Sequence, residues 1–216
     1  MDVCHTAVFV SLHSVMYRKY LKQGIDFAVA LFGLFFLSPI FLILTLILSI
    51  EHKGKPFFFH TRPGKNGKLF ILMKFRTMNE KKDTTDQSRP DRQRITPLGN
   101  FLRKTSLDEL PNLCNVLKGE MSLVGPRPLM PEYLSCYNTE QARRHDVLPG
   151  ITGWAQINGR NAITWKQKFE LDVWYVDNLS FQLDVKILFL TLKNIVRSKN
   201  VNASDEFTME WFNGNN

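Results

Sequence analysis

The sequence predicts a helix-rich α+β protein with one N-terminal membrane helix, a β-hairpin and a compact domain at the membrane surface. Three observations lead to this prediction. Residues 27–50 form an uncharged apolar run, and residues 56–78 have the composition of two strands and a turn. Residues 183–197 repeat apolar side chains at helical spacing. With 216 residues, 44% of them hydrophobic, the chain can bury one full core.

The N-terminal apolar run extends from Phe27 to Ile50 without a charged residue. As a helix, its 24 residues would measure roughly 36 Å, enough to span a bilayer core of about 30 Å. The run is too long for a cleavable signal peptide and is not followed by a small-residue cleavage site. We therefore expect a membrane helix over residues 16–51. Asp26, just before the run, either caps this helix or pairs with Lys22 at i,i+4.

Ser38 and Pro39 lie at the centre of this run. Proline removes a backbone donor, and the serine hydroxyl can bond to a freed carbonyl, so a sharp bend is tolerable in lipid. Basic residues flank both ends of the run: Arg18, Lys19, Lys22, Lys53, Lys55, Arg62 and Lys65. The positive-inside rule then places both ends on the cytoplasmic side. This pattern favours a re-entrant helix-break-helix, with a kinked single span as the alternative.

Residues 56–78 are expected to form a β-hairpin, because two apolar stretches flank the turn sequence Arg-Pro-Gly-Lys-Asn-Gly-Lys. Lys74 and Arg76 lie at the exit of this hairpin, two positions apart, and would share one face of an extended strand. The polar segment 79–94 that follows is typical of an exposed, mobile loop.

The rest of the chain is predicted to be mainly helical. Helices are expected over residues 98–118, with a break near Pro111, and over 133–145, 164–178 and 183–197. Three prolines exclude helix from residues 126–131, and glycines make 148–160 a loop with short extended pieces. The last helix either packs on the core or lies on the membrane surface, and we favour core packing.

Charge and cysteine content limit the functional classes. The formal net charge of +8 fits nucleic acid, an anionic membrane face or a phosphorylated substrate. Nucleic acid is not expected, because the chain has no recognisable binding module and does have an apolar run. The three cysteines, Cys4, Cys114 and Cys136, lack the spacing of a disulfide framework or a zinc site and fit a reducing, cytosolic environment.

Asp108 and Glu109 form a carboxylate dyad within the sequence Ser-Leu-Asp-Glu-Leu-Pro. One interpretation is structural: a capping box in which Ser106 starts a helix and Glu109 bonds back to its amide. The other is catalytic, because Pro111 would disturb that helix in its second turn beside two carboxylates. A carboxylate can act as a nucleophile, and its neighbour can hold a divalent metal.

Four cations are candidates to act with this dyad: Lys74, Arg76, Arg103 and Arg127. Prolines on both sides restrict Arg127 to extended backbone, and a rigidly held guanidinium fork suits phosphate oxygens. Each cation could also be an ordinary surface charge. The sequence contains no Ser-His-Asp pattern, P-loop or dinucleotide-binding motif, so the combination favours chemistry on a phosphate group.

Eight strings in order resemble the monotopic phosphoglycosyl transferases, the small bacterial sugar transferases that start glycan assembly on a polyprenyl phosphate. They include Leu37-Ser-Pro-Ile, Thr61-Arg-Pro-Gly, Lys74-Phe-Arg-Thr-Met, Arg103 to Pro111, Gly125-Pro-Arg-Pro and Leu148 to Arg160. Because the resemblance starts at about Met16, we expect residues 1–15 to be a dispensable extension and 52–216 to be the cytosolic catalytic domain. The resemblance also supports the re-entrant helix.

The resemblance implies transfer of a phospho-sugar from a UDP-sugar to polyprenyl phosphate, with release of UMP. The enzyme would be monotopic, on the cytoplasmic face of the bacterial inner membrane. Asp108 would be the nucleophile that forms an aspartyl-phosphosugar, and Glu109, with Asp108 beside it, would bind Mg²⁺. The substrates would be bound by Lys74, Arg76, Arg103, Arg127, Arg160 and Asp172.

Two other classes stay open: a hydrolase with two carboxylates, and a non-enzymatic membrane-surface scaffold. Adjacent carboxylates make a poor pair on either side of a scissile bond, and a scaffold would not need the dyad. The ending Phe212-Asn-Gly-Asn-Asn resembles minimal members of protein-glycosylation pathways. That likeness and the short architecture suggest an N-acetylated, bacillosamine-type sugar.

Overall fold

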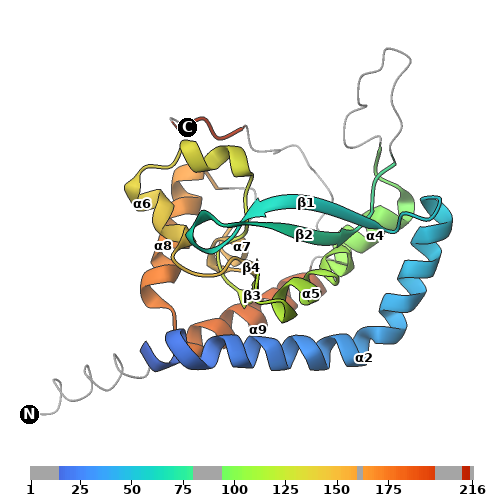
Figure 1. The fold of residues 1–216 in the computed structure, drawn as a ribbon, viewed down its shortest axis with the longest axis horizontal. Helices are drawn as coiled ribbons and strands as arrows, with labels where there is room; N and C mark the ends of the chain where they lie inside the picture. The colour runs from blue at the N-terminus through green and yellow to red at the C-terminus, as the bar shows by residue number, and fades with distance from the viewer. Residues whose placement is uncertain (1–14, 80–93, 160–162, 198–210, 215–216) are drawn as a thin grey trace, which may run out of the picture.

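The computed structural model describes residues 15–79, 94–159, 163–197 and 211–214. The long helix α2 (Lys22–Glu51) runs along the base of the molecule and then rises at one side, and an antiparallel hairpin crosses above it (Figure 1). Helix α8 (Trp165–Asn178) stands at the opposite side, with shorter helices and a second two-stranded sheet between. The architecture is α+β and rich in helix, as predicted.

A short π-helical turn, η1 (Tyr17–Leu21), leads into α2, which continues through Pro39 without interruption. The ribbon of α2 has two arms that meet at an angle (Figure 1). Pro39 cannot donate to the carbonyl of Phe35, four residues earlier, and the Ser38 hydroxyl donates to that oxygen at 2.7 Å. Ser38 therefore has the predicted local role, but the helix is bent and not broken.

Residues 17–51 form a helix that is long and apolar enough to cross a membrane. Many of its large apolar side chains are exposed, among them Phe32, Phe35, Phe36 and Leu42. Water is a poor solvent for a contiguous apolar surface of this kind, so the helix indicates that the chain associates with a membrane. Of residues 1–15, only Val15 is among the described residues.

Both arms of α2 also enter the protein core. Ala30 packs in the main cluster of buried residues, together with Val116, Val124, Tyr175 and Ile187. Leu44 and Leu48 pack in a second cluster, with Phe75, Leu102 and Leu110. The membrane helix is therefore part of the same packed unit as the rest of the chain.

The predicted hairpin is confirmed. Strand β1 (Phe57–Pro63) pairs with β2 (Leu69–Phe75), with Phe57 opposite Phe75. In the turn η2 (Lys65–Gly67), Asn66 and Gly67 have φ angles of 55° and 71°, in the left-handed region that these two residue types enter most readily. Of the loop predicted to follow, residues 80–93 lie outside the described part of the chain.

The segment predicted as a helix over residues 98–118 contains three elements: α4 (Pro97–Thr105), the 3-10 turn η3 (Leu107–Glu109) and α5 (Asn112–Leu117). The two α-helices are separated by residues 106–111, so the predicted break near Pro111 is confirmed, but it begins at Ser106, which ends α4 with a left-handed φ of 57°. The capping box is also wrong: an N-cap residue is extended, and the Ser106 side chain makes no capping hydrogen bond. Pro111 directly precedes α5, where its missing N–H is tolerated.

The helix predicted over residues 133–145 is wrong. The chain there forms the 3-10 turn η4 (Pro131–Ser135), α6 (Thr139–Ala142) and the 3-10 turn η5 (Arg143–His145). Asn138 and Gln141 form a reciprocal capping box that starts α6 as a separate helix. The preceding residues 126–130 are not helical, as predicted, and the last of the three prolines begins η4.

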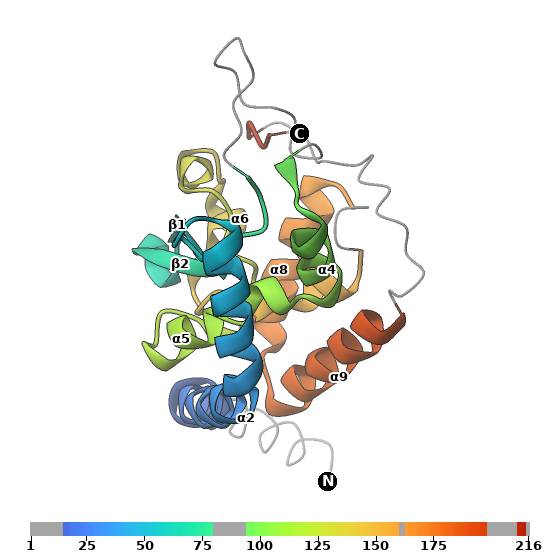
Figure 2. The same ribbon diagram turned by 90° about the vertical axis from the view of Figure 1, so that its right-hand side faces the viewer.

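The last two predicted helices and one extended piece are confirmed, but the strand at residues 122–124 and the short helix at residues 154–157, in a segment expected to be loop, were not predicted. Strand β4 (Gly150–Thr152) is the predicted extended piece; it runs parallel to β3 (Ser122–Val124) and is followed by α7 (Trp154–Ile157). Helices α8 and α9 (Phe181–Arg197) correspond to the last two predicted helices. Leu183 and Ile187 of α9 are buried in the core, while Phe189 and Leu192 are exposed. Figure 2 shows α9 and the first arm of α2 at the same end of the molecule.

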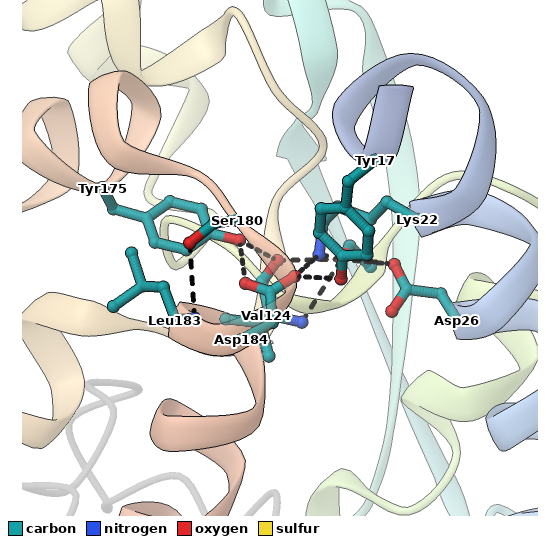
Figure 3. A network of polar contacts seen from close by, with 9 residues as sticks. Tyr17, Lys22, Asp26, Val124, Tyr175, Ser180, Leu183 and Asp184 are labelled. Atoms are coloured by element: carbon teal, nitrogen blue, oxygen red, sulfur yellow. Dashed lines mark hydrogen bonds and ion pairs between the residues drawn. The ribbon is translucent and has the colours of Figure 1, made fainter. Parts of the chain in front are cut away.

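A buried polar network joins the start of α2 to the C-terminal helices (Figure 3). Nζ of Lys22 lies 2.6 Å from Oδ2 of Asp184, and this oxygen also accepts from the Tyr17 hydroxyl at 2.7 Å. The Tyr175 hydroxyl donates to the other oxygen of Asp184 at 2.7 Å. One buried carboxylate on α9 thus accepts hydrogen bonds from three side chains.

Asp26 extends this network along α2. Its carboxylate lies 3.6 Å from Nζ of Lys22 and accepts from the buried Ser122 hydroxyl of β3 at 2.6 Å. The predicted i,i+4 pair is confirmed. Capping is excluded, because Asp26 lies inside α2 and not at its end.

Candidate active site

Asp108 and Glu109 lie on η3, the single 3-10 turn between α4 and α5. The left-handed backbone of Ser106 ends α4, and the amide of Glu109 donates to the Ser106 carbonyl at 3.3 Å, which closes the turn. Both carboxylates are partly buried and line the same cavity. A tight turn between two helices therefore presents two adjacent carboxylates to one space.

Glu109 is neutralised by two cations from distant parts of the chain. Its Oε1 atom lies 2.6 Å from Nζ of Lys74 and 2.7 Å from Nη2 of Arg127. Only 15% of the Glu109 side chain is exposed, and burial by itself would raise its pKa. Arg127 and Lys74 outweigh burial and lower the pKa of Glu109 to about 2, so this carboxylate is ionised at neutral pH.

Asp108 has a different electrostatic environment. Burial, and then the charge of Glu109, raise the pKa of Asp108 above the usual aspartate range, while Lys74 and Arg127 limit the rise. Within the described part of the chain, no hydrogen bond joins the Asp108 carboxylate to another residue. Neighbouring carboxylates whose pKa values are pushed in opposite directions are suited to different chemical roles.

The dyad lines an open cavity of about 1540 Å³. Cationic side chains line it, and so do apolar residues such as Phe58, Phe59 and Ile151. Leu37 of α2, next to Ser38, is also part of the lining. The cavity can therefore contact both an anionic group and an apolar chain.

Four of the predicted cations meet at this cavity. Two of them, Lys74 and Arg127, contact Glu109, and Arg76 and Arg103 line the cavity with them. Arg160, the fifth predicted cation, lies outside the described residues.

Asp172 also lines the cavity, but its carboxylate pairs with another side chain. Oδ2 of Asp172 accepts from Nη2 and Nε of Arg144 at 2.7 Å and 3.1 Å. The sequence analysis assigned no role to Arg144, which stands in the segment wrongly predicted as a continuous helix.

Sequence reasoning missed three further cations that line the cavity: Arg62, Arg94 and Lys168. Burial lowers the pKa of Lys168 to about 8. Lys168 is four residues before Asp172 on α8, and this spacing in the sequence could have indicated that it lies near the predicted site residue Asp172. Nη1 of Arg62 lies 2.8 Å from the sulfur of Met130, which is a weak acceptor for a guanidinium. The string Thr61-Arg-Pro-Gly contained the signal for Arg62.

These features define a class of protein: a membrane-associated enzyme that acts on phosphate groups. The two carboxylates differ in their electrostatic environments, and the cations beside them can neutralise phosphate charge.

Comparison with known proteins identifies the family. A family model described as "Bacterial sugar transferase" matches residues 17–198. The chain is 52% identical over 194 residues to "Uncharacterized sugar transferase EpsL" of Bacillus subtilis, with 90% of this chain and 96% of that protein aligned. It is 36% identical over 195 residues to "Exopolysaccharide production protein ExoY" of Sinorhizobium fredii, with 82% and 86% aligned.

A longer relative has a more specific name. The chain is 39% identical over 185 residues to "UDP-glucose:undecaprenyl-phosphate glucose-1-phosphate transferase" of Escherichia coli, with 81% of this chain and 40% of that protein aligned. The chain belongs to the bacterial sugar transferase family and is a phosphoglycosyl transferase.

Proposed function

We propose that this enzyme transfers a sugar 1-phosphate from a UDP-sugar to undecaprenyl phosphate, releases UMP and so initiates a polysaccharide. The Escherichia coli relative is named for this donor class and acceptor, and the Sinorhizobium relative for exopolysaccharide production. The observation that carries the proposal is the Asp108–Glu109 dyad in a cavity that offers both cations and apolar contacts.

The proposed reaction has two steps, and Asp108 is the nucleophile in the first. An oxygen of Asp108 attacks the phosphorus that carries the sugar, and UMP leaves with the electrons of the phosphorus–oxygen bond that breaks. The resulting aspartyl-phosphosugar is an activated mixed anhydride. A phosphate oxygen of undecaprenyl phosphate then attacks the same phosphorus, and the Asp108 carboxylate is the leaving group. Bonds and charges balance without a co-reactant.

The cations bind and neutralise phosphate groups in this scheme. Arg127 supplies a planar fork for phosphate oxygens, and Lys74 supplies a point charge beside the nucleophile. Both contact Glu109, which holds them next to Asp108 in the absence of substrate. Arg103, Arg62 and Lys168 add positive charge around the same cavity.

The dyad also fits a magnesium ion. Mg²⁺ is commonly bound by one or two carboxylates together with substrate phosphates and water. Asp108 and Glu109 would hold it, and the described residues contain no cluster of three or more His, Cys, Asp or Glu side chains that could bind it alone. When bound, the ion would offset phosphate charge and help to align the two substrates.

The proposal places the enzyme on the cytoplasmic side of the bacterial inner membrane, with α2 entering and leaving on that face. Basic flanks at both ends of the apolar run and the angle between the two arms of α2 support this topology. The cavity lining includes Leu37 at the middle of α2, which is consistent with access for a lipid acceptor.

The test is release of UMP by the full-length protein in detergent or nanodiscs, assayed with UDP-glucose, UDP-galactose and N-acetylated UDP-sugars. The panel also tests the predicted bacillosamine-type sugar. Without acceptor, protein quenched after incubation with the active donor should carry one phosphosugar on the Asp108 peptide by mass spectrometry. Asp108→Asn should fold, because asparagine is nearly isosteric, and should form no adduct.

Alternative functions give different results in this assay. A scaffold would release no UMP, and a hydrolase would turn over fully without acceptor. A requirement for both substrates before any UMP appears would exclude the covalent mechanism, as would near-normal turnover by Asp108→Asn.

A further inference from the structure

Beside the cavity, Arg144 and Asp172 form an ion pair whose side chains are only 1% and 3% exposed. Two hydrogen bonds, at 2.7 Å and 3.1 Å, join the guanidinium to the same carboxylate oxygen. The rings of Tyr137 and Phe169 lie against Arg144, with centroids 5.9 Å and 5.7 Å from its guanidinium carbon. The salt bridge and the two rings hold the guanidinium in one orientation.

The same guanidinium also holds the backbone of Arg127. Nη2 of Arg144 donates to the Arg127 carbonyl oxygen at 2.7 Å. The two residues before it, Gly125 and Pro126, are hydrogen-bonded to the backbone of β4. The Pro-Arg-Pro segment is therefore fixed from behind, while the Arg127 side chain, 44% exposed, extends forward to Glu109.

We infer that Arg144 and Asp172 are positioning residues for Arg127, and that Asp172 acts through Arg144 and not by contact with the substrate. This inference rests on the proposed function, in which Arg127 holds a substrate phosphate. An unpaired carboxylate beside a phosphate would repel it. Paired with Arg144, Asp172 contributes no net charge and instead orients the donor to Arg127. The role differs from the substrate-binding role predicted for Asp172 from the sequence.

If the pair only stabilised the fold, a variant that lacks the pair but keeps the fold would also keep its normal kcat/KM. Replacing a buried ion pair by apolar residues of similar volume is often neutral for stability, whereas removing one partner leaves an uncompensated buried charge. The double variant Arg144→Met/Asp172→Leu should therefore keep the fold while it removes the donor to the Arg127 carbonyl. This variant therefore shows the effect of a misplaced Arg127 on activity without a loss of protein stability.

The experiment measures kcat/KM for UMP release, and the unfolding temperature, for full-length variants. Asp172→Asn and the double variant should each lower kcat/KM roughly 10- to 100-fold, the range seen when a supporting partner is lost or a reacting group is misplaced. Arg143→Gln is the matched control: its contacts with Glu140 and Asp177 are at the surface, so its kcat/KM should be unchanged.

The decisive comparison repeats these changes in an Arg127→Ala background, which removes the guanidinium that the pair would position. If the pair acts through Arg127, Asp172→Asn should then add no more than about a twofold loss. Losses that multiply in full would overturn the inference, and so would normal kcat/KM in the double variant. If the double variant unfolds too easily, Arg144→Lys is used in its place. The lysine keeps the charge beside Asp172 but has one nitrogen where arginine has a fork that contacts both Asp172 and the Arg127 carbonyl. If only the positioning role is wrong, the native protein still releases UMP and still forms the Asp108 adduct. If the proposed function is wrong, these two signals are absent.

Discussion

Nη2 of Arg127 lies 2.7 Å from Oε1 of Glu109, so the proline-flanked arginine already points at the carboxylate dyad. Nζ of Lys74 contacts the same oxygen at 2.6 Å. Glu109 thus holds two cations beside Asp108 and at the same time raises the pKa of that neighbour.

Glu109→Gln tests both effects. The variant should lose roughly 100-fold in kcat, because the cations are no longer held by a charge. In the proposed mechanism Asp108 must be ionised to attack, so activity should fall as the pH drops through its raised pKa. Loss of the Glu109 charge lowers the pKa of Asp108 and should move the acid limb of the kcat/KM profile to lower pH. An acid limb that stays in place would contradict this account; the exposed Glu140→Gln is the control.

The charge of Lys168 should determine part of the pH dependence of UDP-sugar binding on the alkaline side. Burial lowers its pKa to about 8, so its charge is lost as the pH rises through that value. We expect the KM for the UDP-sugar to rise above about pH 8, because the charged fraction falls about tenfold per further pH unit. Lys168→Arg keeps its charge and should hold KM constant to higher pH. The exposed neighbour change Lys166→Arg should leave the profile as it is, and an equal shift in both variants would exclude Lys168.

Lys22→Met should destabilise the protein strongly. It leaves the carboxylate of Asp184 buried without its cationic partner, an effect of about 3–5 kcal/mol in comparable cases. Thermal unfolding in a fixed detergent measures the loss. The exposed Lys19→Met on the same helix is the control, and Lys22→Met/Asp184→Asn should recover part of the stability. Equal unfolding temperatures for Lys22→Met and Lys19→Met would show that the network does not stabilise the fold.

The topology of α2 can be read by cysteine labelling. In a background without the native cysteines, Lys19→Cys and Lys55→Cys should both react only from the cytoplasmic side, as should Lys118→Cys in the rest of the chain. Replacing Ser38 and Pro39 together by Leu should move part of the population to a spanning form, since the apolar run is long enough. Labelling of the two ends from opposite sides in the native sequence would disprove re-entrance.

Local patterns allowed a correct prediction of several elements. The uncharged run is helical, although without the predicted break, and the Asn-Gly turn of the hairpin and the helix that contains Leu183 and Ile187 form as predicted. Each of these patterns depends on residues that are close together in the sequence. The cations Lys74 and Arg127 were found because their types suit phosphate, and the fold does bring them to Glu109.

Features that depend on distant or competing contacts were missed. Arg144 and Asp172 are 28 positions apart and Lys22 and Asp184 are 162 apart, so neither pair leaves a periodic signal. The left-handed Ser106 was mistaken for a helix start because its side chain suits an N-cap, although its backbone ends α4. The start of α6 at Asn138 was overlooked although Asn138 and Gln141 have the spacing of a capping box.

Along its whole length, helix α2 contacts the protein core on one face and exposes apolar side chains on the other. Ala30 and Leu48 are fully buried against protein, whereas Phe36 and Ile50 are about three-quarters exposed, at 74% and 76%. The two faces should therefore tolerate change differently: bulk added at Ala30 would force apart close-packed helices, while one apolar side chain can replace another at Phe36. Trimming the chain to obtain a water-soluble enzyme would remove one wall of the core, so the choice of detergent or lipid acts on the fold itself.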